Sequence, residues 1–144
     1  MENYALESYK NAATQTASPA KLIQMLYDGA IRFLEFSLAG FKESDPLLFN
    51  RTVSNNIIRA QAIINELNGV LDMEQGGELA VKLRDLYLYM DSTLQTSNAK
   101  KEMGGVQDVI NRLRIVRESW SKMMAGSTAL DLGDASRGTV EGRL

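Results

Sequence analysis

Apolar residues recur along this chain at alternating steps of three and four, which is the spacing of one face of an α-helix. The clearest run consists of Val53, Ile57, Ala60, Ile64, Leu67 and Leu71. No segment shows the apolar/polar alternation that is typical of a half-buried β-strand. The periodicity therefore predicts an all-α fold.

Start signals divide the periodic stretch into helices. Ser18-Pro19 and Asp45-Pro46 each place a capping side chain before a proline, whose fixed φ and missing N–H suit the first helical position. Two later runs follow the turn segments "DMEQGGE" and "SNAKKEMGG". The expected helices span about 18–41, 46–71, 77–97 and 103–124.

Short turns make consecutive helices antiparallel neighbours, so the expected architecture is an antiparallel four-helix bundle over residues 18–124. Residues 1–17 precede the first cap and form a separate N-terminal segment. Residues 125–144 are rich in Gly, Ser, Thr and Ala without a sustained period, and we expect a flexible C-terminal tail there.

The first two helices carry more large apolar residues than one buried face needs. In the first helix, Met25, Ile31 and Phe36 lie outside the two lines that we assign to the core. In the second, Ile58, Ile63 and Val70 lie off the seam. The core assignments for the last two helices are Leu79, Leu83, Leu86, Tyr87, Met90, Leu94, Val106, Val109, Ile110, Leu113, Val116, Trp120 and Met123. The surplus predicts a surface for a partner.

Composition narrows the functional classes. The chain has 144 residues, of which 44% are hydrophobic and 24% charged, as expected for one soluble domain. It contains no histidine and no cysteine, which removes the usual general base, nucleophile and metal ligands. The net charge of −2 gives no general attraction to nucleic acid. We expect no catalytic residues, no metal site, no cofactor and no enzymatic activity.

The N-terminus does not show the pattern of a secretion signal. "MENYALESYK" has no basic segment leading into an apolar one, and no run approaches the roughly 18 apolar residues that a membrane span needs. We expect a cytoplasmic protein without stable membrane insertion.

Three stretches resemble a known family. They are "SYKNAATQTASPAKLIQMLYDGAIRFL" (8–34), "AQAIINELNGVLDMEQGGELAVKLRDLYLYM" (60–90) and "NRLRIVRESW" (111–120). In this order and spacing they look like the flagellar export chaperone family FliS, over about residues 4–124. The family resemblance implies an antiparallel four-helix bundle and a non-enzymatic function.

The resemblance also implies a client. Members of the family bind the otherwise disordered C-terminal segment of flagellin, which wraps around the bundle and folds into short helices against apolar grooves. Binding prevents premature polymerisation and aids type III flagellar secretion. Components of the export apparatus are a second class of partner that the sequence leaves open.

The candidate client-binding residues are large side chains that lie off the densest seam or in the matched motifs. They are Tyr9, Leu22, Ile23, Met25, Leu26, Tyr27, Ile58, Leu67, Leu71 and Leu88. Three large side chains before the first cap, Tyr4, Leu6 and Tyr9, are candidates for a lid over apolar surface. The alternative for this segment is a frayed end.

Two other functions stay open. The apolar surplus could serve a generic helical adaptor, which dimerises or binds a different partner helix. An enzyme is the third class, and it would need an acid/base pair built without histidine. For the chaperone we expect a monomer or a weak dimer.

Overall fold

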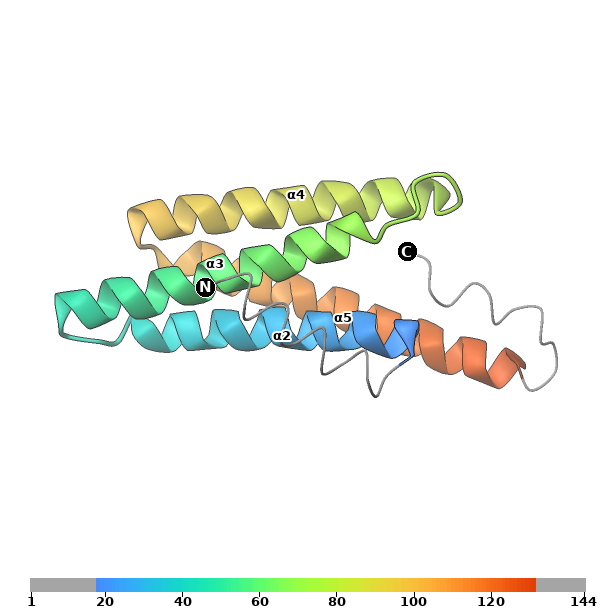
Figure 1. Cartoon of the computed structure of the whole chain (residues 1–144), viewed down its shortest axis with the longest axis horizontal. Coiled ribbons are helices and arrows are strands. Elements are labelled where there is room, and N and C mark those ends of the chain that lie inside the picture. Colours follow the sequence, from blue (N-terminus) through green and yellow to red (C-terminus); the bar gives the residue numbers. More distant parts are fainter. Residues whose placement is uncertain (1–17, 132–144) are drawn as a thin grey trace.

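Four helices make up the described part of the chain. The computed structural model describes residues 18–131, and the side chains up to residue 126. The helices are α2 (Pro19–Gly40), α3 (Pro46–Gly69), α4 (Gly77–Lys100) and α5 (Met103–Asp131), and residues 18–131 contain no β-strand. Figure 1 shows them side by side as one bundle. The predicted all-α four-helix bundle is confirmed.

The two predicted caps are present. The Lys21 amide donates to Ser18 Oγ at 3.2 Å, and the Leu47 amide donates to Asp45 Oδ1 at 3.1 Å. Each cap satisfies one of the amides that a helix start leaves without an intrahelical partner. Gly77, where α4 begins, has φ +58°, a conformation that glycine adopts without the steric cost of a side chain. Local chemistry therefore sets these three starts.

Neighbouring helices contact one another around the bundle. α2 packs against α3 and α5, and α4 packs against the same two helices. Each helix therefore buries a face wide enough for two neighbours. This width explains two corrections: Ile31 and Ile63, which the sequence places outside the core lines, are 9% and 1% exposed and belong to the core. The assigned core lines were therefore narrower than the face that each helix buries.

Two other core assignments are wrong. Leu79 is 49% exposed and Met123 is 39% exposed. Both lie where α4 and α5 meet near the start of α4, and α5 extends past the beginning of α2 at this end of the bundle (Figure 1). A side chain near the end of a bundle has fewer neighbours than helical periodicity implies.

The last helix is longer than expected. The sequence predicts an end near residue 124, but α5 continues to Asp131. No proline occurs after Pro46, and Ala125, Ala129 and Leu130 all favour helix. The change in composition after residue 124 is therefore not a helix boundary. Residues 132–144 of the expected tail lie outside the described residues.

A polar ladder joins α3 to α4 along their shared edge. Ser54 Oγ donates to Asn98 Oδ1 at 2.9 Å, Gln61 Nε2 donates to Asp91 Oδ1 at 3.1 Å, and Arg84 Nε donates to Asn68 Oδ1 at 3.2 Å. On each helix successive rungs are seven residues apart, two turns of helix. A slip of α4 along α3 would separate all three donors from their acceptors. The ladder therefore specifies the register of this antiparallel pair.

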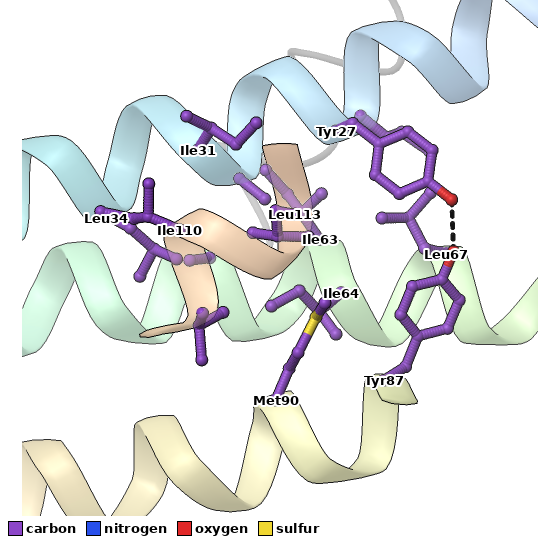
Figure 2. Packing of buried hydrophobic residues seen from close by; sticks show 14 of the residues in the cluster. Tyr27, Ile31, Leu34, Ile63, Ile64, Leu67, Tyr87, Met90, Ile110 and Leu113 are labelled. Atoms are coloured by element: carbon purple, nitrogen blue, oxygen red, sulfur yellow. Dashed lines mark hydrogen bonds between the residues drawn. The ribbon is translucent and has the colours of Figure 1, made fainter. Parts of the chain in front are cut away.

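A buried pair of tyrosines connects the two helices on the diagonal. The hydroxyls of Tyr27 in α2 and Tyr87 in α4 are 2.5 Å apart, and Figure 2 shows the two rings pointing toward each other beside Leu67. Burial raises the pKa of Tyr27 to about 12, although the hydrogen bond with Tyr87 opposes the shift. Burial, and then the proximity of Tyr27, raise the pKa of Tyr87 further. Both phenols are neutral in the folded state near neutral pH.

We predict that the two hydroxyls stabilise the bundle only as a pair. Tyr27→Phe leaves the Tyr87 hydroxyl buried without its partner, which should lower the free energy of unfolding by about 1–3 kcal/mol. The double variant Tyr27→Phe/Tyr87→Phe removes both polar groups and should lose less than the sum of the two single variants. Urea unfolding of all four proteins measures the coupling. Additive losses would contradict the prediction.

The same pair predicts a loss of stability in alkali. The pKa of Tyr27 is higher in the folded state than the ordinary tyrosine value of about 10, so its contribution is complete below that value. Above it the unfolded chain loses phenolic protons first, and the free energy of unfolding falls as the pH rises. Urea unfolding from about pH 8 to about pH 11 measures this slope. The double Phe variant should show a shallower decline, and equal slopes would refute the assignment.

Candidate functional site

An apolar cavity opens on the seam between α4 and α5. Its volume is about 130 Å³. The residues that line it come from three helices and are Tyr27, Leu79, Leu83, Val116, Ser119, Trp120 and Met123. Leu79 and Met123 are substantially exposed, whereas Tyr27 and Trp120 are buried. The cavity therefore connects the apolar core with the molecular surface.

The polar atoms of the two buried rings already have partners. The Tyr27 hydroxyl is paired with Tyr87, and Trp120 Nε1 donates to the carbonyl oxygen of Ala20 at 3.2 Å. The second bond ties α5 to the first turn of α2. Ser119 contributes the remaining hydroxyl to the lining. The cavity is thus built for an apolar group.

Polar contacts bridge the same seam further along α4, beside a second hollow of about 310 Å³ that is lined by Tyr89, Ser92, Thr93, Thr96, Ser97, Glu102 and Gly105. Tyr89 Oη donates to Asp108 Oδ2 at 2.8 Å, and the Arg112 guanidinium lies 4.5 Å from the centre of the Tyr89 ring. Arg112 Nε also pairs with Asp108 Oδ1 at 3.0 Å. Tyr89 lies ten residues after Leu79, about 15 Å along α4. The apolar cavity therefore lies near the start of α4, and the second hollow, which is lined mostly by polar side chains, lies toward the end of α4.

Ion pairs line the edge between α2 and α5. Arg114 Nη2 lies 2.8 Å from Glu35 Oε2, and Arg117 pairs with Asp28. The hydrogen bond to Asp28 raises the pKa of Arg117 above its usual value. The side chains are roughly one-third to one-half exposed, so each pair contributes at most about 1 kcal/mol. These ion pairs therefore contribute little to the stability of the bundle.

Other apolar side chains on α3 and α4, or next to them, are exposed outside the cavity. Val81 and Leu88 are seven residues apart on α4 and are 49% and 53% exposed, and Val70, just after α3, is 41% exposed. Ile58 on α3 is partly exposed. We call Ile58, Val70, Val81 and Leu88 the α3/α4 face. Two of its members, Ile58 and Val70, are residues that the sequence marks as surplus, and they come before and after the ladder residue Gln61 in the chain.

The predicted client-binding residues divide into three groups. Leu22, Met25 and Ile58 are partly exposed and Leu88 is exposed. Five others lie in the hydrophobic core, and these are Ile23, Leu26, Tyr27, Leu67 and Leu71. The third group is Tyr9 alone, which lies outside the described residues together with the other two lid candidates, Tyr4 and Leu6. Of the members of the predicted set that the structure describes, only Tyr27 lines the cavity.

The sequence interpretation missed the rest of the cavity. Leu79, Val116 and Met123 are assigned to the core by their periodicity, and Ser119 draws no attention as a single polar residue. The available signal is the small Ser119 between Val116 and Trp120 on the side of α5 that faces α4. A small side chain between large ones on a packed face leaves unfilled volume.

Comparison with known proteins identifies the family. The family model described as "Flagellar protein FliS" matches residues 1–127. The chain belongs to the FliS family. The flagellar secretion chaperone FliS of Salmonella typhimurium is 32% identical over 112 residues, which cover 78% of this chain and 81% of that protein. The FliS of Campylobacter jejuni is 31% identical over 126 residues, covering 88% and 95%.

A third relative gives the same result. The FliS of Bacillus subtilis is 30% identical over 115 residues, which cover 80% of this chain and 82% of that protein. The resemblance seen in the sequence is thereby confirmed, and membership of the FliS family supports a role as a flagellar export chaperone.

Within residues 18–131, no helix is both long enough and apolar enough to span a bilayer.

Proposed function

We propose that this FliS protein is a cytoplasmic chaperone that binds the disordered C-terminal segment of flagellin before export. In this proposal, the bound segment folds against apolar surfaces of the bundle and is kept from polymerising. The supporting observation is that large apolar side chains present surface that the core does not bury. This surface lies in the α4/α5 cavity and on the α3/α4 face. The cytoplasm is the compartment in which a client must be held until the export apparatus receives it.

The cost of ordering a disordered client explains why two separate surfaces are useful. Folding on binding costs about 2–5 kcal/mol of the interaction energy and is typically offset by burying roughly 1,000–3,000 Å². One cavity of about 130 Å³ is too small for such an area. A client that crosses both the α4/α5 seam and the α3/α4 face would spread its contacts over several helices. Short amphipathic helices with anchors at i, i+3, i+4 and i+7 suit such grooves.

The contact residues follow from exposure. We assign direct contacts to Leu22, Met25, Ile58 and Leu88, whose side chains reach the surface. The buried members of the predicted set, such as Leu26 and Leu67, then act by supporting this surface from the core. Residues 1–17 are proposed to compete with the client for apolar surface through Tyr4, Leu6 and Tyr9. Binding of export apparatus components would use surface that the client leaves free.

Ile58→Asp tests the α3/α4 face. The charge should weaken binding of a flagellin C-terminal peptide by at least about ten-fold, because one large apolar contact is lost and a carboxylate is desolvated. Titration calorimetry measures the affinity, and circular dichroism checks that the helices persist. Asn55→Asp is the matched control, since it adds the same charge at an exposed position of α3.

The same samples separate the chaperone from an adaptor. Light scattering should show a one-to-one complex when the peptide is added to the wild-type protein. Unchanged affinity of Ile58→Asp with intact helicity would remove the α3/α4 face from the site. A dimer whose mass does not change when the peptide is added would contradict the proposed function.

A further inference from the structure

The chain continues beyond the part that matches the family model. The match ends at residue 127, but α5 continues to Asp131, and residues 132–144 follow it. We infer that this 132–144 segment docks on its own bundle and competes with the client, with Leu144 in the α4/α5 cavity and Val140 on its rim. The contact itself stands apart from the proposed function, whereas its effect on client binding rests on that function.

The 132–144 segment begins at the same end of the bundle as the cavity. Met123 lines the cavity, and the last residue of α5, Asp131, comes eight residues later, which is about 12 Å further along the helix axis. Figure 1 shows this last part of α5 extending past the beginning of α2. The segment therefore starts close to the opening of the cavity.

The length of the segment determines which of its residues reach the cavity. A chain that turns back from Asp131 must cover about 12 Å along α5 and about 10 Å across it, because a helix with its side chains is about 10–12 Å wide. An extended chain spans at most about 3.3–3.6 Å per residue, so this path uses at least about five residues. Leu132 directly follows the helix and is too close to its end to reach the cavity. Val140 and Leu144 come nine and thirteen residues after Asp131, and both reach it.

The cavity and its rim match these two side chains in size and polarity. An apolar cavity of about 150 Å³ stays dry and binds benzene, so a cavity of about 130 Å³ accommodates one Leu side chain. Leu79 and Met123 line the cavity and are substantially exposed, and they offer apolar surface to Val140. Apolar groups are thus matched both inside the cavity and around it.

Charges near the opening are also complementary. Glu78 comes directly before the rim residue Leu79, is exposed, and has no ion-pair partner among the side chains of residues 18–126. Arg143 comes directly before Leu144. With Leu144 in the cavity, the Arg143 guanidinium can reach the Glu78 carboxylate. An exposed ion pair adds little affinity, but it favours one orientation of the segment.

Tethering makes so small a contact effective. A peptide with a single anchor binds weakly when it is free in solution, but a short flexible connection holds the anchor at a roughly millimolar effective concentration. A client that contacts several surfaces of the bundle binds more tightly and displaces the segment. The cavity is therefore covered in the free protein and is released to the client.

Disulfide cross-linking tests the contact without any client. The chain contains no cysteine, and Lys82 is exposed on α4 three residues after Leu79, so the pair Lys82→Cys/Gly142→Cys reports on the approach of the segment. Mild oxidation should form the intramolecular disulfide. Adding Leu144→Ser should slow its formation about three- to ten-fold, because the anchor is lost while the two cysteines keep their positions in the chain. Leu132→Ser is the matched control and should leave the rate unchanged.

Trp120 reports on whether the cavity is occupied. It is the single tryptophan of the chain and lines the cavity. Deletion of residues 132–144 should shift its emission to longer wavelength, because water then reaches the cavity wall. Leu144→Ser should give the same shift, and Leu132→Ser should emit like the wild type.

Removing the competitor should strengthen client binding. Leu144→Ser and the deletion of residues 132–144 should each bind a flagellin C-terminal peptide about two- to ten-fold more tightly than the wild type, because the binding-competent state no longer has to be released. Titration calorimetry measures the affinities, with Leu132→Ser again as the control.

The outcomes separate this inference from the proposed function. Equal cross-linking rates with and without Leu144→Ser would overturn the docked segment. Disulfides that form mainly between molecules would also overturn it, because the occupant would then come from a second copy. Emission that shifts on deletion of residues 1–17 but not of residues 132–144 would assign the cavity to the N-terminal segment instead. A wild-type protein that binds no flagellin peptide would refute the proposed function and leave the cross-linking result standing.

Discussion

α4 is held by a different kind of contact on each side, and this asymmetry decides where the bundle can accept a partner. Toward α3 it makes a polar ladder with a seven-residue repeat, and across the diagonal Tyr87 bonds to Tyr27. Toward α5 it contributes core side chains and one polar cluster around Tyr89, and near its start the packing leaves a cavity. Register and position of α4 are therefore fixed without closing the seam to α5.

This arrangement would suit the proposed chaperone function, because the exposed apolar side chains are mostly not the ones that fill the core. The fully buried residues, among them Leu34, Ile57 and Leu113, supply apolar burial for folding. Leu79, Leu88 and Met123 are partly buried, and the exposed parts of their side chains remain available. Large apolar patches on a monomer typically mark interaction sites. In FliS the relevant partner would be a chain that has no core of its own until it binds.

Sequence reasoning predicted the fold well because the decisive signals are local. Ser18, Asp45 and the apolar periodicity set the helix starts and the bundle, and both caps form as expected. It failed where the answer depends on how helices meet. The exposure of Leu79 and the burial of Ile63 follow from bundle ends and from a face shared by two neighbours, neither of which is encoded in one helix. The cavity depends on side chains of α2, α4 and α5 together, so no single periodic run could reveal it.

We propose that apolar surface left outside the core captures a disordered chain, and the heat capacity change of binding measures the burial of that surface directly. Titration calorimetry of a flagellin C-terminal peptide at several temperatures gives this quantity. We expect a large negative heat capacity change, corresponding to burial of roughly 1,000–3,000 Å² on coupled folding and binding. A one-to-one complex whose enthalpy does not change with temperature would contradict it.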